Sequence, residues 1–209
     1  MRIIFLDIDG VLNHACTHEL FDGCIGVDQG NLEAFRKLVE ESNKEEETKI
    51  VLSSSWRIGV DQYGKEIPNH YQYLTERLAF VGISIYSETP FYEEEDDGFR
   101  WEEKRGHEIM AWLEAHKELG IGSYVVLDDV LFTDFKELGI SRYLVRTSWD
   151  SPRGGFTEKH IKKAMAILHL PMKTASFQVS ANTLSMKDES VKNLKNGKVS
   201  KPVDPSSFK

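Results

Sequence analysis

Three apolar runs that end in acids or serines constrain the fold more than any other feature of this chain. The runs are RIIFLD (2–7), TKIVLSSSW (48–56) and SYVVLDD (123–129). Continuous apolar runs of this length are typical of strands buried on both faces of a parallel sheet. If the three strands are neighbours in one sheet, their polar ends converge on one patch beyond its carboxyl edge.

The segments between these runs have the apolar spacing of amphipathic helices. Four such helices are expected, at residues 27–41, 71–82, 101–120 and 157–170. Asp28 is placed to cap the first of them, and two shorter apolar runs, 83–88 and 141–147, fit additional strands. The alternation predicts an α/β fold, a three-layer α/β/α sandwich with a central parallel sheet.

The 209 residues fit one domain of ordinary size and an appendage. We expect the domain at 1–170 and a polar, basic tail at 171–209 that is flexible or loosely docked, or that binds a partner. The net charge of −8 argues against nonspecific binding to nucleic acid. Because no stretch approaches the apolar length that a membrane helix needs, we expect a cytoplasmic protein with no membrane partner.

One group of metal-ligand residue types lies close to the first apolar run. His14, Cys16, His18 and Cys24 suggest a zinc site by composition. Their spacing matches none of the usual zinc patterns, and alternating residues in a short loop would need an unusual wrap. We therefore interpret them as ordinary loop residues.

Acidic side chains follow two of the three apolar runs, and they suggest a metal site with a chemical role. If the runs are neighbours, four carboxylates meet there, those of Asp7, Asp9, Asp128 and Asp129. Like charges at this distance repel unless a cation offsets them, and a hard cation with oxygen ligands, Mg²⁺, fits best. Asp9 is expected to bind it through its backbone carbonyl.

The same acids fit phosphoryl transfer. Asp7, the last residue of its run, is best placed to act as a nucleophile that forms an aspartyl-phosphate. The side chain of Asp9 points to the same side of an extended segment, so it can protonate the leaving oxygen and later activate water.

Hydroxyl and basic residues complete this set. Ser53 offers a hydroxyl to a phosphoryl oxygen, and Arg105 or Lys104 would offset the charge that develops on the transferred group. Adjacent helical residues point about a hundred degrees apart, so only one of the two enters the site, and we favour Arg105. Further candidates for phosphate binding are Gly10, Ser54, Lys104 and Arg57.

Four segments in order resemble the motifs of the haloacid dehalogenase (HAD) superfamily of aspartate-nucleophile phosphatases. They are LDIDGVLN (6–13), VLSSS (51–55), KRG (104–106) and VVLDD (125–129). The resemblance spans roughly residues 2–170. It implies the Rossmann-like HAD fold, dependence on Mg²⁺ and the residue roles given above.

Within that superfamily, three segments are most similar to the phosphatase modules of RNA-repair proteins, relatives of the phosphatase half of polynucleotide kinase/phosphatase. They are SSSWR (53–57), RGHEIMAWL (105–113) and VVLDD (125–129). The resemblance implies a phosphorylated nucleic-acid end or nucleotide as substrate.

The spacing of the motifs leaves little room for a cap domain. Only about forty residues separate the first motif from the second strand, and one helix uses much of that length. We therefore expect a minimal cap or none, and a site open to a bulky phosphomonoester. The alternatives are a small-metabolite or phosphoprotein phosphatase and a non-catalytic HAD-fold binding protein. A signalling receiver domain is set aside, because its acceptor aspartate lies in the middle of the chain.

Overall fold

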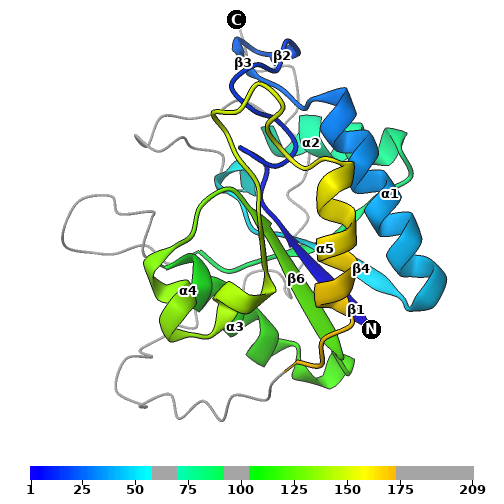
Figure 1. Ribbon diagram of the computed structural model, residues 1–209, viewed down its shortest axis with the longest axis vertical. Helices are drawn as coiled ribbons and strands as arrows, with labels where there is room; N and C mark the ends of the chain where they lie inside the picture. The colour runs from blue at the N-terminus through cyan, green and yellow to red at the C-terminus, as the bar shows by residue number, and fades with distance from the viewer. Residues whose placement is uncertain (58–69, 92–103, 173–209) are drawn as a thin grey trace, which may run out of the picture. The chain divides into compact units, whose positions relative to one another are not determined.

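The computed structural model describes residues 1–57, 70–91 and 104–172 (Figure 1). Residues 173–209, nearly all of the predicted tail, lie outside the described residues, so the domain boundary stays a prediction. In the part of the chain that is described, no helix has the length and apolar character needed to cross a bilayer.

A five-stranded parallel sheet forms the centre of the fold, in the order β5-β4-β1-β6-β7. Its strands are β1 (Arg2–Leu6), β4 (Thr48–Leu52), β5 (Ile85–Glu88), β6 (Ser123–Asp128) and β7 (Leu144–Arg146). Every residue of β1 and of β6 is buried, as the continuous apolar runs predict. The three runs are therefore the three neighbouring central strands, and the predicted parallel α/β sheet is confirmed.

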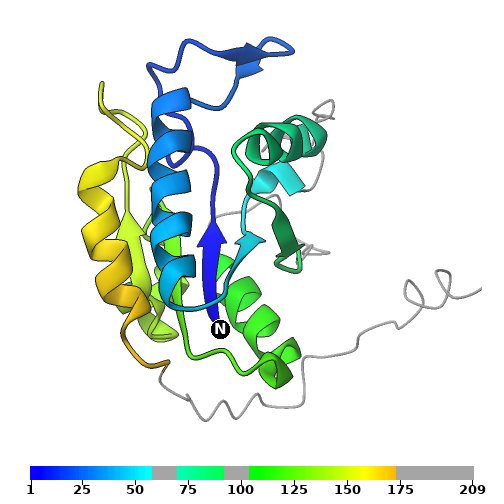
Figure 2. The ribbon, with the colours of Figure 1, turned by 90° about the vertical axis from the view of Figure 1, so that its right-hand side faces the viewer.

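Helices cover both faces of the sheet (Figures 1 and 2). On one face, α1 (Gln29–Glu45) and α5 (Glu158–Leu168) lie side by side, while α3 (Arg105–Ala115) lies on the other. Phe5 of β1 packs edge-on against Trp112 of α3, with 5.5 Å between the ring centroids. Two further helices are α2 (His70–Phe80) and α4 (Thr133–Glu137).

The helix boundaries follow local chemistry that is visible in the sequence. The Asp28 carboxylate accepts hydrogen bonds from the backbone amides of Gly30 and Asn31, which confirms the predicted cap of α1. At the start of α5, Thr157 and His160 form a reciprocal capping box.

Several elements differ from the expectations. The helix expected at 101–120 ends at Ala115. A separate 3₁₀ turn, Lys117–Leu119, follows it, and Gly120 after this turn has a left-handed conformation. The strand expected at 141–147 is shorter, because its first half belongs to a 3₁₀ turn, Ile140–Tyr143. The strand that pairs with β6 in this segment is limited to β7, Leu144–Arg146.

A short hairpin, β2 (Leu20–Phe21) with β3 (Cys24–Ile25), was not expected. Its turn residues Asp22 and Gly23 both have positive φ, 50° and 81°. Asp-Gly is a strong local signal for such a turn, so the sequence did carry this information. In the described residues, the insertion between β1 and α1 amounts to this hairpin and its flanking loops.

Candidate active site

The register of the sheet places three chain segments next to each other. Leu6 pairs with Leu52 of β4 and with Leu127 of β6, so β1 and β4 end at the same level and β6 ends one residue further. The ladder continues one residue further, because the amide of Asp7 donates to the Leu127 carbonyl (3.0 Å) and that of Ser53 to the Leu6 carbonyl (2.8 Å). Asp7, Ser53 and the end of β6 thus share one edge.

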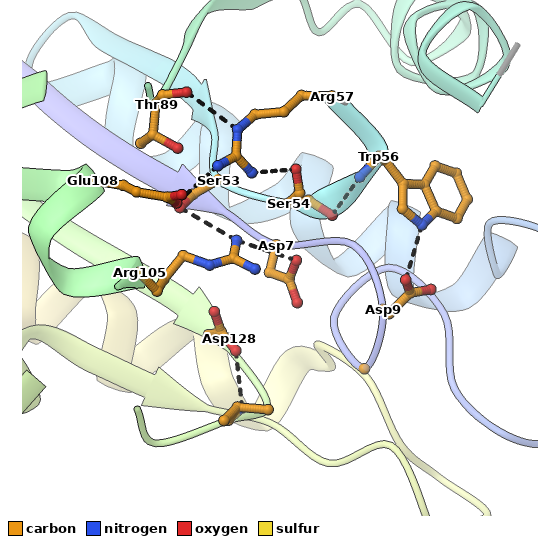
Figure 3. Close-up of polar contacts among 12 residues, drawn as sticks. Asp7, Asp9, Ser53, Ser54, Trp56, Arg57, Thr89, Arg105, Glu108 and Asp128 are labelled. Atoms are coloured by element: carbon orange, nitrogen blue, oxygen red, sulfur yellow. Dashed lines mark hydrogen bonds and ion pairs between the residues drawn. The ribbon is translucent and has the colours of Figure 1, made fainter. Parts of the chain in front are cut away.

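Three carboxylates meet at this edge, and Figure 3 shows two of them, those of Asp7 and Asp128. Asp7, Asp128 and Asp129 each place an oxygen within 4.8 Å of the others. Asp7 is 8% exposed and Asp128 1% exposed, so both carboxyl groups have lost nearly all contact with water. One oxygen of Asp128 accepts a hydrogen bond from the amide of Val130 (2.9 Å), which fixes its direction.

Burial makes this cluster costly in the absence of a cation. It raises the pKa of Asp7 from 3.8 to about 7, a shift that the Arg105 guanidinium and the Ser54 hydroxyl oppose. Burial and the neighbouring Asp7 raise the pKa of Asp128 well above its ordinary value, and burial raises that of Asp129. A divalent cation such as Mg²⁺ binds carboxylate oxygens, and its charge offsets the repulsion among them. These residues therefore fit the predicted cofactor.

Asp9 does not join the three carboxylates. Its Oδ2 accepts a hydrogen bond from the indole Nε1 of Trp56, and its Oδ1 accepts one from the side-chain amide of Asn13, both at 2.9 Å. The charge of Asp9 still contributes to the raised pKa of Asp7 and of Asp129, so its carboxylate lies near the cluster. That its backbone carbonyl binds the metal stays a prediction.

Gly10 allows the chain to pass tightly beside the cluster. Its φ of +73° is one that other residues rarely adopt, and a Cβ at this position would lie 2.4 Å from the carboxyl carbon of Asp129. The Gly10 carbonyl accepts a hydrogen bond from the Thr147 hydroxyl (2.6 Å), which ties this turn to the end of β7. The absence of a side chain at Gly10 therefore leaves room for the carboxyl group of Asp129.

Arg105, the first residue of α3, is a basic side chain whose contacts reach the acids. Its Nη1 lies 3.4 Å from the Ser53 hydroxyl and 3.7 Å from Oδ1 of Asp7. The guanidinium also lies over the ring of Phe132, 5.3 Å from its centroid. Lys104 precedes the helix as its N-cap residue.

Arg57 has a different environment from the one expected of a phosphate ligand. Its Nη2 forms a buried ion pair with Glu108 of α3 (2.8 Å), and its Nε donates to the Thr89 carbonyl (3.1 Å). It also donates to the carbonyls of Ser54 and Pro90 and lies over the ring of Phe91, 5.9 Å from its centroid. The guanidinium therefore joins the loop after β4 to α3 (Figure 3).

A family model described as the HAD domain in Swiss Army Knife RNA repair proteins matches residues 3–161. The chain belongs to this family. Searches of the curated proteins and of the solved structures gave no match. The family match confirms the resemblance that the four motifs indicated, and with it the HAD-like fold, and it supports a HAD-type phosphatase.

The zinc site suggested by composition does not form in this HAD domain. Among the described residues, the group able to hold a metal ion consists of the three aspartates at the carboxyl edge. Cys16 and Cys24 are exposed free cysteines, and Nδ1 of His14 accepts a hydrogen bond from the amide of Cys16 (3.2 Å). This agrees with their interpretation as loop residues.

Sequence reasoning missed three residues that shape the site of the HAD domain, namely Asn13, Trp56 and Glu108. Asn13 and Trp56 stand inside two of the quoted motifs, but nothing in their spacing shows that both contact Asp9. Glu108 lies one turn after Arg105, and its partner, Arg57, is 51 positions away in the chain. Only the folded chain reveals these pairs.

Binding of Mg²⁺ should raise the melting temperature of this protein, because the cation offsets repulsion among three buried carboxylates. At about a hundredfold excess over Kd, a ligand adds about 2.7 kcal/mol to the free energy of unfolding. Protons compete with the cation for Asp7, so the effect should be larger at about pH 8 than at about pH 6. Thermal unfolding with Mg²⁺ and with EDTA measures it.

In EDTA, the wild type should become more stable from about pH 8 to about pH 6, because the pKa of Asp7 is higher in the folded state than in the unfolded state. Asp128→Asn should lose the response to Mg²⁺ and, in EDTA at about pH 8, be more stable than the wild type. Asp150→Asn, at an exposed acid, should keep the response. Equal melting temperatures with Mg²⁺ and EDTA would contradict the metal site.

Proposed function

We propose that this HAD domain is a Mg²⁺-dependent phosphomonoesterase that uses Asp7 as its nucleophile and acts on a phosphorylated nucleic-acid end. One observation carries the proposal. At the carboxyl edge of the sheet, the buried carboxylate of Asp7 lies close to two further acids, Asp128 and Asp129. The guanidinium of Arg105 also lies close to it. Anionic and cationic groups in this arrangement suit a reaction in which a phosphoryl group passes to a carboxylate.

In the first step, a carboxylate oxygen of Asp7 attacks the phosphorus, and the bond from phosphorus to the leaving oxygen breaks. Protonated Asp9 gives its proton to that oxygen, so the product leaves as a neutral alcohol. The phosphoryl group is then covalently bound to Asp7 as an aspartyl-phosphate, and Asp9 is ionised.

In the second step, a water molecule attacks the phosphorus of the aspartyl-phosphate. Asp9 accepts a proton from this water, and the bond between phosphorus and the Asp7 oxygen breaks. Inorganic phosphate leaves, Asp7 is again a carboxylate, and Asp9 is again protonated for the next substrate.

The remaining residues stabilise and orient the phosphoryl group. Arg105 faces the phosphoryl oxygens, which carry the negative charge of the transferred group. The hydroxyls of Ser53 and Ser54 offer hydrogen bonds to these oxygens at the end of β4. Mg²⁺, bound by Asp7, Asp128 and Asp129, supplies positive charge that offsets the negative charge of the substrate.

Two features favour a nucleic-acid end over a small metabolite or a phosphoprotein. The matched family comprises HAD domains of RNA-repair proteins. Beside the acids, Val130 and Leu131 are 41% and 51% exposed, and the exposed Arg146 donates from Nε to the Asp129 carbonyl (3.0 Å). Apolar surface and a guanidinium beside a phosphate site suit the base and the next phosphate of a strand.

Replacement of the nucleophile tests the reaction. The wild type with Mg²⁺ should release phosphate from some of a panel of nucleotides and of 3′- and 5′-phosphorylated oligonucleotides. Asp7→Asn should reduce kcat by about 10³-fold or more, because a neutral amide cannot take the phosphoryl group. Asp150→Asn, an exposed acid, serves as the control. Equal phosphate release by the wild type and Asp7→Asn would contradict the mechanism.

Substitutions at the rim of the site, here Arg146 and Leu131, test which class of substrate binds. Arg146→Ala and Leu131→Ser should each raise KM for a phosphorylated oligonucleotide about fivefold or more, because a phosphate or base contact is lost. Hydrolysis of p-nitrophenyl phosphate should stay within about twofold, since this ester does not reach the rim. Phe80→Ser, on an exposed apolar side chain of α2, is the control. An unchanged KM for the oligonucleotide would favour a small phosphomonoester.

A further inference from the structure

We propose that Trp56 is a positioning residue that aims the carboxyl group of Asp9 at the leaving oxygen. The inference rests on the proposed function, because it assigns to Asp9 the transfer of a proton. It adds a residue from the SSSWR segment (53–57) whose side chain acts through a hydrogen bond and does not touch the phosphoryl group.

Two donors hold the Asp9 carboxylate from opposite ends. The indole Nε1 of Trp56 donates to Oδ2, and Nδ2 of Asn13 donates to Oδ1, each at 2.9 Å. Asn13 is itself fixed, because its Oδ1 accepts a hydrogen bond from the amide of Gly10 (3.1 Å). Rotation of the carboxyl group would break at least one of these bonds, so the plane of the group is set. Figure 3 shows the bond from Trp56.

The indole is rigidly held in turn. Trp56 is 4% exposed and packs edge-on against His70, with 4.8 Å between the ring centroids. The ring of Tyr73 of α2 also lies near the indole, with 6.4 Å between the ring centroids. The next residue, Arg57, is locked by its ion pair with Glu108. The N–H of the indole therefore has one direction in which to donate.

Restraint of Asp9 matters because of what lies beside it. The three clustered acids form a site for a divalent cation, and an unrestrained carboxylate nearby would be drawn into that site as a further ligand. A carboxyl group bound to a cation cannot carry a proton to the substrate. By holding both oxygens, Trp56 and Asn13 keep Asp9 outside the cluster and available for proton transfer.

A positioning role predicts a dependence on the leaving group. A ribose or alkyl oxygen is a poor leaving group and needs a proton as its bond to phosphorus breaks, whereas p-nitrophenolate leaves readily without one. In a single turnover, Trp56→Phe should therefore slow release of the dephosphorylated oligonucleotide, the first step, about 10- to 100-fold. With p-nitrophenyl phosphate, the first-step release of p-nitrophenolate should slow by no more than about threefold. Steady-state kcat should fall for both substrates, because Asp9 also accepts the proton of water in the second step, which they share.

Phenylalanine leaves a space beside His70, so a second variant separates chemistry from packing. The benzothiophene analogue of tryptophan, incorporated at residue 56, keeps the shape of the side chain and lacks only the N–H donor. It should show the same selective loss with a wild-type melting temperature. Trp112→Phe is the matched control, because the buried indole of Trp112 donates to the Ser87 hydroxyl at the same 2.9 Å and not to Asp9. It should slow the first step selectively for neither substrate.

The outcomes are distinguishable from those of the proposed function. A selective loss on the poor leaving group in both variants at residue 56 supports the positioning role. An equal loss of the first-step rate on both substrates, or no loss on either, overturns it, while the wild type remains a phosphatase. Absence of activity in the wild type across the phosphomonoester panel overturns the proposed function and this inference together.

Discussion

The shared register of three parallel strands, β4, β1 and β6, at their carboxyl ends is the constraint on which the rest of the structure depends. Since Leu6, Leu52 and Leu127 share one register, the residues after them emerge at one point. Two of these positions hold acids, so the fold confines like charges in a space that excludes water. Burial, and after it repulsion by the neighbouring acids, raises the pKa of Asp7. The carboxylates at this edge therefore suit a divalent cation.

The surrounding residues keep this unfavourable cluster in place. Gly10 lets a backbone turn pass against the Asp129 side chain, where any Cβ would collide with the carboxyl group. The buried pair of Arg57 and Glu108 joins the loop after β4 to α3, and α3 in turn presents Arg105 to the acids. The polar interactions at this edge therefore act as one network, in which most members position others and few face the substrate.

The sequence predicted the features that depend on local pattern. Continuous apolar runs identified the central strands, and Asp28 identified the start of α1. Three of the four acids expected to meet do so, those of Asp7, Asp128 and Asp129, because topology alone brings the ends of parallel strands together. The fourth, Asp9, is held apart by Trp56 and Asn13. The orientation of side chains could not be predicted: Arg57 faces Glu108, and Trp56 contacts Asp9 across 47 positions. Such contacts depend on rotamers and packing, which no spacing encodes.

A crystal structure of the protein grown with Mn²⁺ and beryllofluoride tests the central claim most directly. Mn²⁺ substitutes for Mg²⁺ at oxygen sites and is located by its anomalous scattering, and beryllofluoride mimics a phosphoryl group on a carboxylate. We predict one anomalous peak coordinated by Asp7 and Asp128, with beryllofluoride bonded to the other oxygen of Asp7. A peak remote from these acids, or beryllofluoride bound elsewhere with the Asp7 carboxylate unmodified, would contradict the account.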